Sequence, residues 1–291
     1  VLDLYYADAL ATYARAYGWE IRQRARVESA GELELGKWTL DPAVDAADRA
    51  YRELWARREQ WGSEPLGELA RYIEQNTFPP RIRGTLRDAV SYLWVELLAD
   101  SSLWSAVESN EVFRLDAAAL IAGDARGSIS LDLAGPAVHP LSTIGAVLAD
   151  LESWHRDGSR PEAALEARLE RLRRLREALT AEDDRLAIRA DLEAVQARFD
   201  RSLEWWSMGQ SVLAELIQQE PAADAMIRAL AVARAGRDRH PRSVGGQRCA
   251  HLAAAIEAPQ YSVESMAVDG AGKRSIRISH RNLDRLHFRA W

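Results

Sequence analysis

Two helical patterns joined by a turn fill residues 141–179, and the same pattern recurs along most of the chain. The stretch reads LSTIGAVLADLESWHRDGSRPEAALEARLERLRRLREAL. Ser159 and Glu162 have the spacing of a capping box, which predicts that the second helix begins there. One stripe of that helix carries Leu165, Leu169, Leu172, Leu175 and Leu179. Apolar stripes on two neighbouring helices predict an antiparallel helix pair.

Helical periodicity extends outward from this stretch over residues 1–258. The predicted helices span about 2–28, 42–58, 65–76, 83–99, 115–122, 141–154, 161–179, 182–206, 221–237 and 244–257. Residues 123–140 are rich in Gly and Pro, and we interpret them as a connector, with a functional loop as the alternative. The spacing of the helix pairs is irregular. The sequence therefore predicts a mainly α protein, in which antiparallel helix pairs form an α-solenoid or bundle.

A short antiparallel β segment is expected after the helices. At Pro259 the period of the apolar residues changes from about 3.6 to about 2. The alternating apolar residues are Tyr261, Val263, Ile276, Ile278, Leu286, Phe288 and Ala290. Residues 259–291 are far fewer than the roughly 100 of an immunoglobulin-type sandwich. We therefore expect a helical domain at 1–258 and the incomplete beginning of a β-sandwich at 259–291.

Composition excludes several classes of protein. The 291 residues include 44 acidic and 38 basic side chains, giving a net charge of -6, so no nucleic-acid partner is expected. No apolar run approaches the roughly 20 residues that span a bilayer, so no direct membrane insertion is expected. A single cysteine excludes an internal disulfide and a Cys-rich zinc module. Because no signal-peptide pattern follows Val1 and a strand-like run reaches Trp291, we expect an excised piece of a larger protein.

Catalytic and metal-binding motifs are missing from the sequence. Cys249 and His251 are two residues apart in a predicted helix, where they do not face each other, so Cys249 is interpreted as a core residue. The six histidines form no metal-ligand spacing. We therefore expect no catalytic residue, no cofactor and no metal. The prediction is a non-enzyme, with a helical enzyme whose pocket gathers polar groups from several helices as an alternative.

An arginine-rich run begins at Arg171 and includes Arg173, Arg174 and Arg176. Glu170 precedes Arg174 by four residues, which is the spacing of a favourable helical ion pair. We interpret the run as a solvated face with ion pairs, and a phosphate-binding patch is the alternative.

Four aromatic residues are candidate interface residues. Trp205 and Trp206 are adjacent, so in a helix their side chains point about 100° apart. One of them is expected to face a neighbouring helix or another domain. Phe288 and Trp291 lie in the last strand-like run, where an incomplete sheet would leave them uncovered.

The C-terminal part resembles the bacterial alpha-2-macroglobulin family. The residues that carry this resemblance are Ser243, Cys249, Leu252, Ile256 and Glu257 in a helix and Ser279 to Arg289, SHRNLDRLHFR, in a strand motif. Upstream, YGWEI at residues 17–21 and GTLRD at residues 84–88 are also similar to the family's helical region.

This resemblance implies a tetratricopeptide-like helical region that leads into the first macroglobulin-type β-sandwich of a large periplasmic or cell-envelope protein. Many members trap proteases through a bait segment and an internal Cys–Gln thioester. Cys249 is followed by Ala250, His251 and Leu252, so it lacks the glutamine of that thioester. Any inhibitory chemistry of the parent protein would therefore lie outside this sequence.

Two hypotheses about function follow. The first is a non-catalytic helical scaffold or docking region of an alpha-2-macroglobulin-like protein that inhibits proteases. Its partners would be the remaining macroglobulin domains, and a protease or an envelope protein. The alternative is a stand-alone α-solenoid that binds a peptide or a protein in a concave groove, with the C-terminal strands as a finished hairpin.

Overall fold

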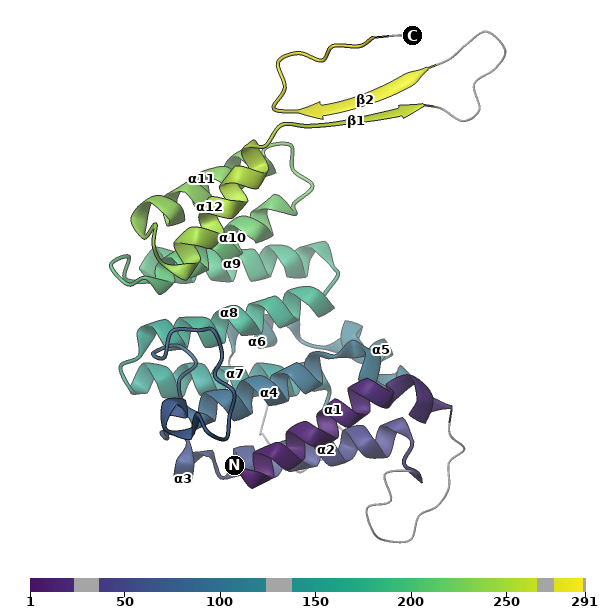
Figure 1. Ribbon diagram of the computed structural model, residues 1–291, viewed down its shortest axis with the longest axis vertical. Coiled ribbons are helices and arrows are strands. Elements are labelled where there is room, and N and C mark those ends of the chain that lie inside the picture. The colour runs from purple at the N-terminus through teal and green to yellow at the C-terminus, as the bar shows by residue number, and fades with distance from the viewer. Residues whose placement is uncertain (24–36, 124–137, 266–274, 290–291) are drawn as a thin grey trace. The chain divides into compact units, whose positions relative to one another are not determined.

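The computed structural model describes residues 1–23, 37–123, 138–265 and 275–289. Predictions for residues 24–28, for most of the 123–140 connector and for Trp291 fall outside these ranges. The described chain is mainly helical, with helix pairs packed together and one two-stranded antiparallel sheet near its C-terminal end (Figure 1), which confirms the predicted fold class. It divides into two compact units, Val1–Ala197 and Arg198–Trp291.

The first unit is a series of helices, most of them packed in pairs. Its α-helices are α1 (Leu2–Arg22), α2 (Leu40–Ala56), α3 (Arg58–Trp61), α4 (Leu86–Ala99), α5 (Ala106–Glu111), α6 (Ala117–Ala122), α7 (Pro140–Asp157), α8 (Pro161–Ala178) and α9 (Glu182–Arg198). Among the described residues, short 3-10 helices lie between them at Leu66–Leu69, Ser101–Leu103 and Val112–Arg114. Helix α1 packs on α2, α2 on α4, α4 on α7, and α7 on α8.

Apolar stripes drive this packing. All five leucines of the predicted α8 stripe, Leu165, Leu169, Leu172, Leu175 and Leu179, are buried, as expected. Between α2 and α4 the rings of Trp55 and Trp94 lie 5.9 Å apart. The buried indole of Trp94 donates a hydrogen bond to Asp48 at 2.8 Å, so this large side chain adds apolar contact without leaving its N–H unpaired.

Two predictions are wrong, one for the start of a helix and one for a whole helix. Ser159 does not cap α8, because it has a left-handed backbone (φ 56°) and belongs to the turn that ends α7, where its N–H bonds Arg156. The helix predicted at 65–76 is only the single 3-10 turn Leu66–Leu69. Backbone pairing draws this segment away from a helix, since the N–H of Leu66 donates to Gly84 and Pro65 forms a β-bridge with Thr85.

The single helix predicted at 182–206 is in fact two. Helix α9 ends at Arg198, and α10 begins at Trp205. Between them the carboxylate of Asp200 accepts a hydrogen bond from the N–H of Ser202 at 2.8 Å. Such a local side-chain bond competes with helical bonding and stabilises a turn.

The second unit contains a three-helix bundle of α10 (Trp205–Gln218), α11 (Ala225–Arg239) and α12 (Val244–Glu257). Its core includes Ala214, Ala233, Cys249 and Ala253, small residues that let the helices approach closely. The closest approach is at Gly245, where a Cβ atom would lie 2.1 Å from the backbone nitrogen of Met208. Only glycine allows α12 to pass α10 at this distance.

A β-hairpin follows α12 directly. Strands β1 (Gln260–Ser265) and β2 (Ile276–Arg281) pair antiparallel, with Val263 opposite Ile278. Both lie where period-two alternation predicts them. The third strand-like run is not a strand over its described residues 285–289, because the chain turns away from β2 at Asn282, whose φ is 53°.

Candidate functional site

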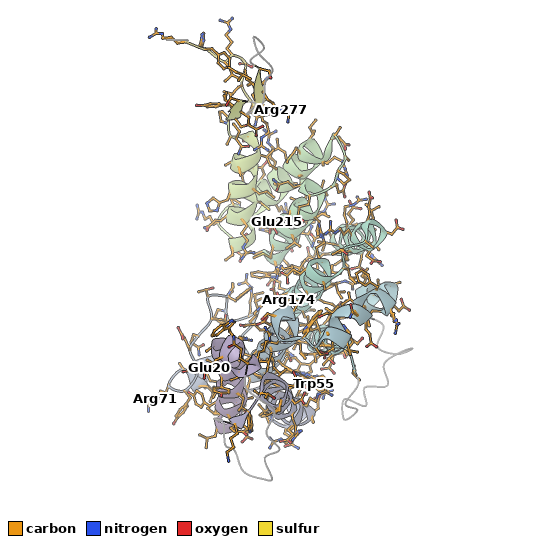
Figure 2. The ribbon with its side chains drawn as sticks, turned by 90° about the vertical axis from the view of Figure 1, so that its right-hand side faces the viewer. Glu20, Trp55, Arg71, Arg174, Glu215 and Arg277 are labelled. Carbon is orange, nitrogen blue, oxygen red and sulfur yellow. The ribbon has the colours of Figure 1, made fainter. Side chains whose placement is uncertain are left out.

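The hairpin has one apolar and one polar face, and both are exposed. Residues directly opposite each other in an antiparallel pair share a face. Tyr261, Val263, Ile276 and Ile278 therefore lie on one face, and the charged residues Glu264 and Arg277 lie on the other. None of the described helices of this unit covers the apolar face, and side chains such as Arg277 stand clear of the helices (Figure 2). Because a two-stranded hairpin needs a covered apolar face for stability, this face is a candidate docking surface.

Side chains at the end of β2 and directly after it clamp the hairpin to the end of α12. The amide nitrogen of Asn282 donates to the carbonyl oxygens of Ile256, at 2.7 Å, and Ala258, at 3.2 Å. The guanidinium of Arg281 donates to the carbonyl oxygen of Ala255 at 3.1 Å. The last carbonyls of a helix lack partners within the helix. The clamp satisfies them and fixes how the hairpin leaves α12.

The four candidate interface residues have different surroundings. Trp205 and Trp206 are both buried at the start of α10, so neither offers an open surface, and their proposed role toward another domain stays a prediction. Phe288 is 61% exposed, as expected for an uncovered segment. Trp291 lies outside the described residues. Of the three that the structure describes, only Phe288 is exposed.

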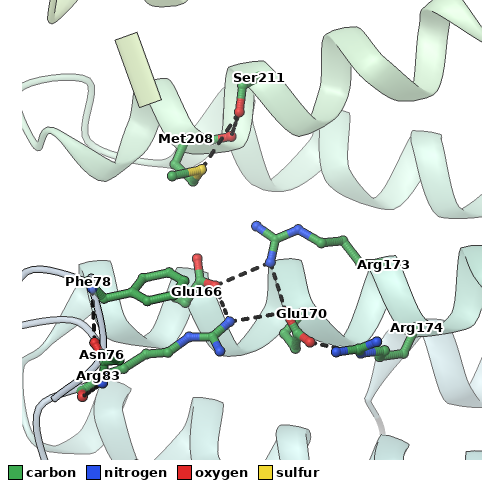
Figure 3. A network of polar contacts seen from close by, with 9 residues as sticks. All are labelled: Asn76, Phe78, Arg83, Glu166, Glu170, Arg173, Arg174, Met208 and Ser211. Carbon is green, nitrogen blue, oxygen red and sulfur yellow. Dashed lines mark hydrogen bonds and ion pairs between the residues drawn. The ribbon is translucent and has the colours of Figure 1, made fainter. Parts of the chain in front are cut away.

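A buried polar network joins α8 to the loop before α4. The guanidinium of Arg83 contacts the carboxylates of Glu166 at 2.6 Å and Glu170 at 3.1 Å (Figure 3). Arg173 contacts the same two carboxylates at 3.2 and 2.9 Å. The rings of Tyr92 and Phe78 lie 3.7 and 4.1 Å from the Arg83 guanidinium. These contacts hold the loop on the helix.

Charge balance keeps Glu170 ionised. Burial alone would raise the pKa of Glu170, but the guanidinium groups of Arg83, Arg173 and Arg174 lower it below its ordinary value. Arg174 contacts Glu170 at 2.8 Å, which confirms the predicted i,i+4 pair. With each carboxylate shared between arginines, the network stabilises packing and offers no free group for chemistry.

The interpretation of the arginine run as a solvated face is wrong at its first residue. The side chain of Arg171 has 0% exposure and contacts Glu152 of α7 at 2.8 Å. Its partner lies on another helix, so the sequence spacing gave no sign of the pair. A buried guanidinium requires such a partner because an unpaired buried charge is strongly destabilising.

A histidine–aspartate pair links α4 to α7. The Nε2 atom of His155 lies 2.7 Å from Asp88, and each side chain is 1% exposed. The other carboxylate oxygen of Asp88 accepts from the backbone N–H of Thr85, completing a capping box at the start of α4. This capping box was not predicted from the sequence, although Thr85 and Asp88 have the Thr-x-x-Asp spacing that indicates one. Because the pair is shielded from solvent, it cannot meet a dissolved substrate, and its observed role is to join two helices.

Cys249 is a core residue, as predicted. Its thiol is buried against the Ser207 carbonyl at 3.4 Å, and burial raises its pKa to about 12. A thiol that is buried and protonated is a poor nucleophile. His251, two residues later, is exposed.

An open cavity of about 420 Å³ lies in the first unit. Trp104, Val112, Phe113 and Leu141 give it an apolar lining. Its charged residues, Arg174 and Glu177, pair with each other at 3.4 Å. Such a lining can accept an apolar side chain, but it does not assemble an acid, a base and a nucleophile.

Within the described ranges no group of three or more His, Cys, Asp or Glu side chains is placed to hold a metal ion. The helices of those same residues include none long and apolar enough to cross a bilayer. No protein-family model, curated protein or solved structure was found to match the chain.

Proposed function

We propose that the chain is a non-catalytic helical scaffold that docks a macroglobulin-type β domain on its C-terminal hairpin. It would belong to a bacterial alpha-2-macroglobulin-like protein of the periplasm or cell envelope, whose other parts inhibit proteases. The observation that carries the proposal is the uncovered apolar face formed by Tyr261, Val263, Ile276 and Ile278. Strands of a β-sandwich are the occupant that this face fits, since they can cover its apolar side chains and pair with its free edges.

The clamp at Asn282 supports a docking role. A hairpin on a flexible tether would lose conformational entropy when a β domain docked on it. The hydrogen bonds from Asn282 and Arg281 to the end of α12 reduce that loss, because they hold the hairpin before docking. The three-helix bundle thus serves as a support that presents the strands.

Two double variants of the full polypeptide encoded by the gene test the proposal. Val263→Lys with Ile278→Lys places two charges on the apolar face, at directly opposed positions. Ser262→Lys with Ser279→Lys places the same charges on the polar face, at the next opposed pair. The first variant is expected to lower the unfolding temperature of the adjoining β domain and to expose it to proteolysis, whereas the second should leave both unchanged. Equal effects of the two variants, or a gene that encodes no β domain, contradict the proposal.

A further inference from the structure

The outer face of α1 carries an apolar seam with no cover from the described chain. Its members are Leu2, Tyr5, Ala9, Thr12, Ala16 and Trp19, and all six are exposed. Leu2 is 81% exposed and Trp19 is 78% exposed. The opposite face of the helix packs on α2 through buried residues such as Leu10. A surface helix normally has a polar outer face, so a seam of this kind requires explanation.

The spacing of the seam is that of a coiled coil. The six residues alternate in steps of three and four, the pattern of the a and d positions of a heptad. Leu2, Ala9 and Ala16 take a positions, and Tyr5, Thr12 and Trp19 take d positions. A face with this pattern packs side chains into a matching helix.

A second copy of α1 in antiparallel orientation matches this seam. In antiparallel coiled coils each a residue packs beside a d residue of the other helix. Leu2 then meets Trp19 of the second copy, Ala16 meets Tyr5, and Ala9 meets Thr12. Leu2 and Trp19 pack at the two ends of the pair, and the large Tyr5 packs against the small Ala16. The small residues Ala9 and Thr12 meet at the centre, where the two backbones come closest. A parallel pair would place Tyr5 against Tyr5 and Trp19 against Trp19, leaving the packing uneven.

Charges beside the seam favour the same orientation. Asp8 and Arg15 occupy equivalent flanking positions one heptad apart. In the antiparallel pair Asp8 of one copy faces Arg15 of the other, and symmetry forms this contact twice. Within one chain Arg15 contacts Glu96 at 3.1 Å and Asp100 at 3.9 Å, and Asp8 accepts a long 3.5 Å bond from Tyr51. Antiparallel helix dipoles add to the attraction.

We propose that α1 forms the interface of a symmetric homodimer, in which two copies of the chain pair as an antiparallel coiled coil. The helix has 21 residues, which corresponds to about 30 Å of interface. An interface of one helix pair is at the small end for specific complexes, so the dimer forms in the micromolar range and dissociates on dilution. Glu20, labelled in Figure 2, marks the end of the seam near the C-terminus of α1. This inference is independent of the hairpin.

Sedimentation velocity of the chain over a dilution series tests the dimer. Ala9→Glu places two charges near the dyad at an exposed helical site, so it should weaken dimerisation by about a hundredfold or more without loss of helical circular dichroism. Phe113→Glu is the matched control, because it puts the same charge on another exposed apolar residue outside α1. A chain that stays monomeric throughout the series, or an Ala9→Glu variant that dimerises like the parent, overturns the proposal.

Cysteine cross-linking tests the orientation. The native thiol of Cys249 is buried, so only the introduced cysteines can form cross-links. An oxidised mixture of Tyr5→Cys and Ala16→Cys chains should give disulfide-linked heterodimers. Each variant by itself should not cross-link, since like positions would lie about 16 Å apart along the antiparallel pair. Efficient cross-linking of Tyr5→Cys to itself would show that the helices do not pair in this register.

Discussion

The side-chain amide of Asn282 donates a 2.7 Å hydrogen bond to the carbonyl oxygen of Ile256 in the last turn of α12. It joins the start of the chain beyond β2 to the end of the helix before β1. Its left-handed backbone turns the chain back toward α12, a conformation that asparagine tolerates better than most residues. The direction of the hairpin therefore depends in part on a residue that is neither in the hairpin nor in the helix.

Asn282→Ala should loosen the hairpin and destabilise the second unit by about 1–2 kcal/mol, because two carbonyls lose their donor. A spin label at Ser262→Cys, with Cys249 buried, should become more mobile in the variant. Asn282→Gly is the matched control, since glycine keeps the left-handed backbone without the amide. Mobility in Asn282→Gly that equals the parent's would mean that the hydrogen bonds contribute nothing.

Arg83→Met should destabilise the first unit by about 3–5 kcal/mol, because it leaves the buried carboxylates of Glu166 and Glu170 with fewer partners. Chemical denaturation followed by circular dichroism measures this loss. Arg234→Ala is the comparison, since its pair with Glu257 is about half exposed, and it should cost less than about 1 kcal/mol. Similar losses for the two variants would contradict the assignment of Arg83 to a buried network.

Protonation of Glu170 should contribute to the loss of stability at acid pH. The pKa of this group is lowered on folding, so its stabilising effect is present above its ordinary value of 4.5 and is lost as pH falls through the folded value. Glu170→Gln should lower stability at neutral pH and flatten its decline in acid. Denaturation at neutral pH and at a series of pH values below 5 gives both quantities. An unchanged acid slope would show that Glu170 is not held ionised by its arginines.

Truncation after Ala258 should leave the helices folded. The removed residues contribute the hairpin and the clamp, whereas the core of the three-helix bundle lies in α10, α11 and α12. Helical circular dichroism should therefore change little, with a small drop in unfolding temperature from the lost bonds to Ile256 and Ala258. Loss of most of the helical signal would place the boundary of the helical part elsewhere.

The sequence predicted those features that depend on local periodicity. The leucine stripe of α8 and the alternation around Val263 and Ile278 each require only near neighbours, and both are confirmed. The break between α9 and α10 was missed because Leu203 and Trp206 continue the helical spacing across it, while the turn depends on one bond from Ser202 to Asp200.

The polar contacts could not be predicted in the same way. Arg171 pairs with Glu152 and His155 with Asp88 across different helices, so their partners become visible only when the helices are packed. The same is true of Asn282, which the sequence marked through a resemblance without indicating which atoms it binds. In the candidate docking site, strands β1 and β2 could be predicted from the sequence. The clamp at Asn282 that orients them could not.

Hydrogen exchange of the hairpin amides in the 291-residue chain tests the docking claim most directly. With its apolar face uncovered, the hairpin should open more often than the helices, and amides of β1 and β2 should exchange at least about a hundredfold faster than those of α12. Those of α12 should exchange far more slowly and serve as an internal reference. Slow exchange in β1 and β2, comparable to that of α12, would show a finished and self-sufficient hairpin, and it would contradict the proposed docking of a β domain.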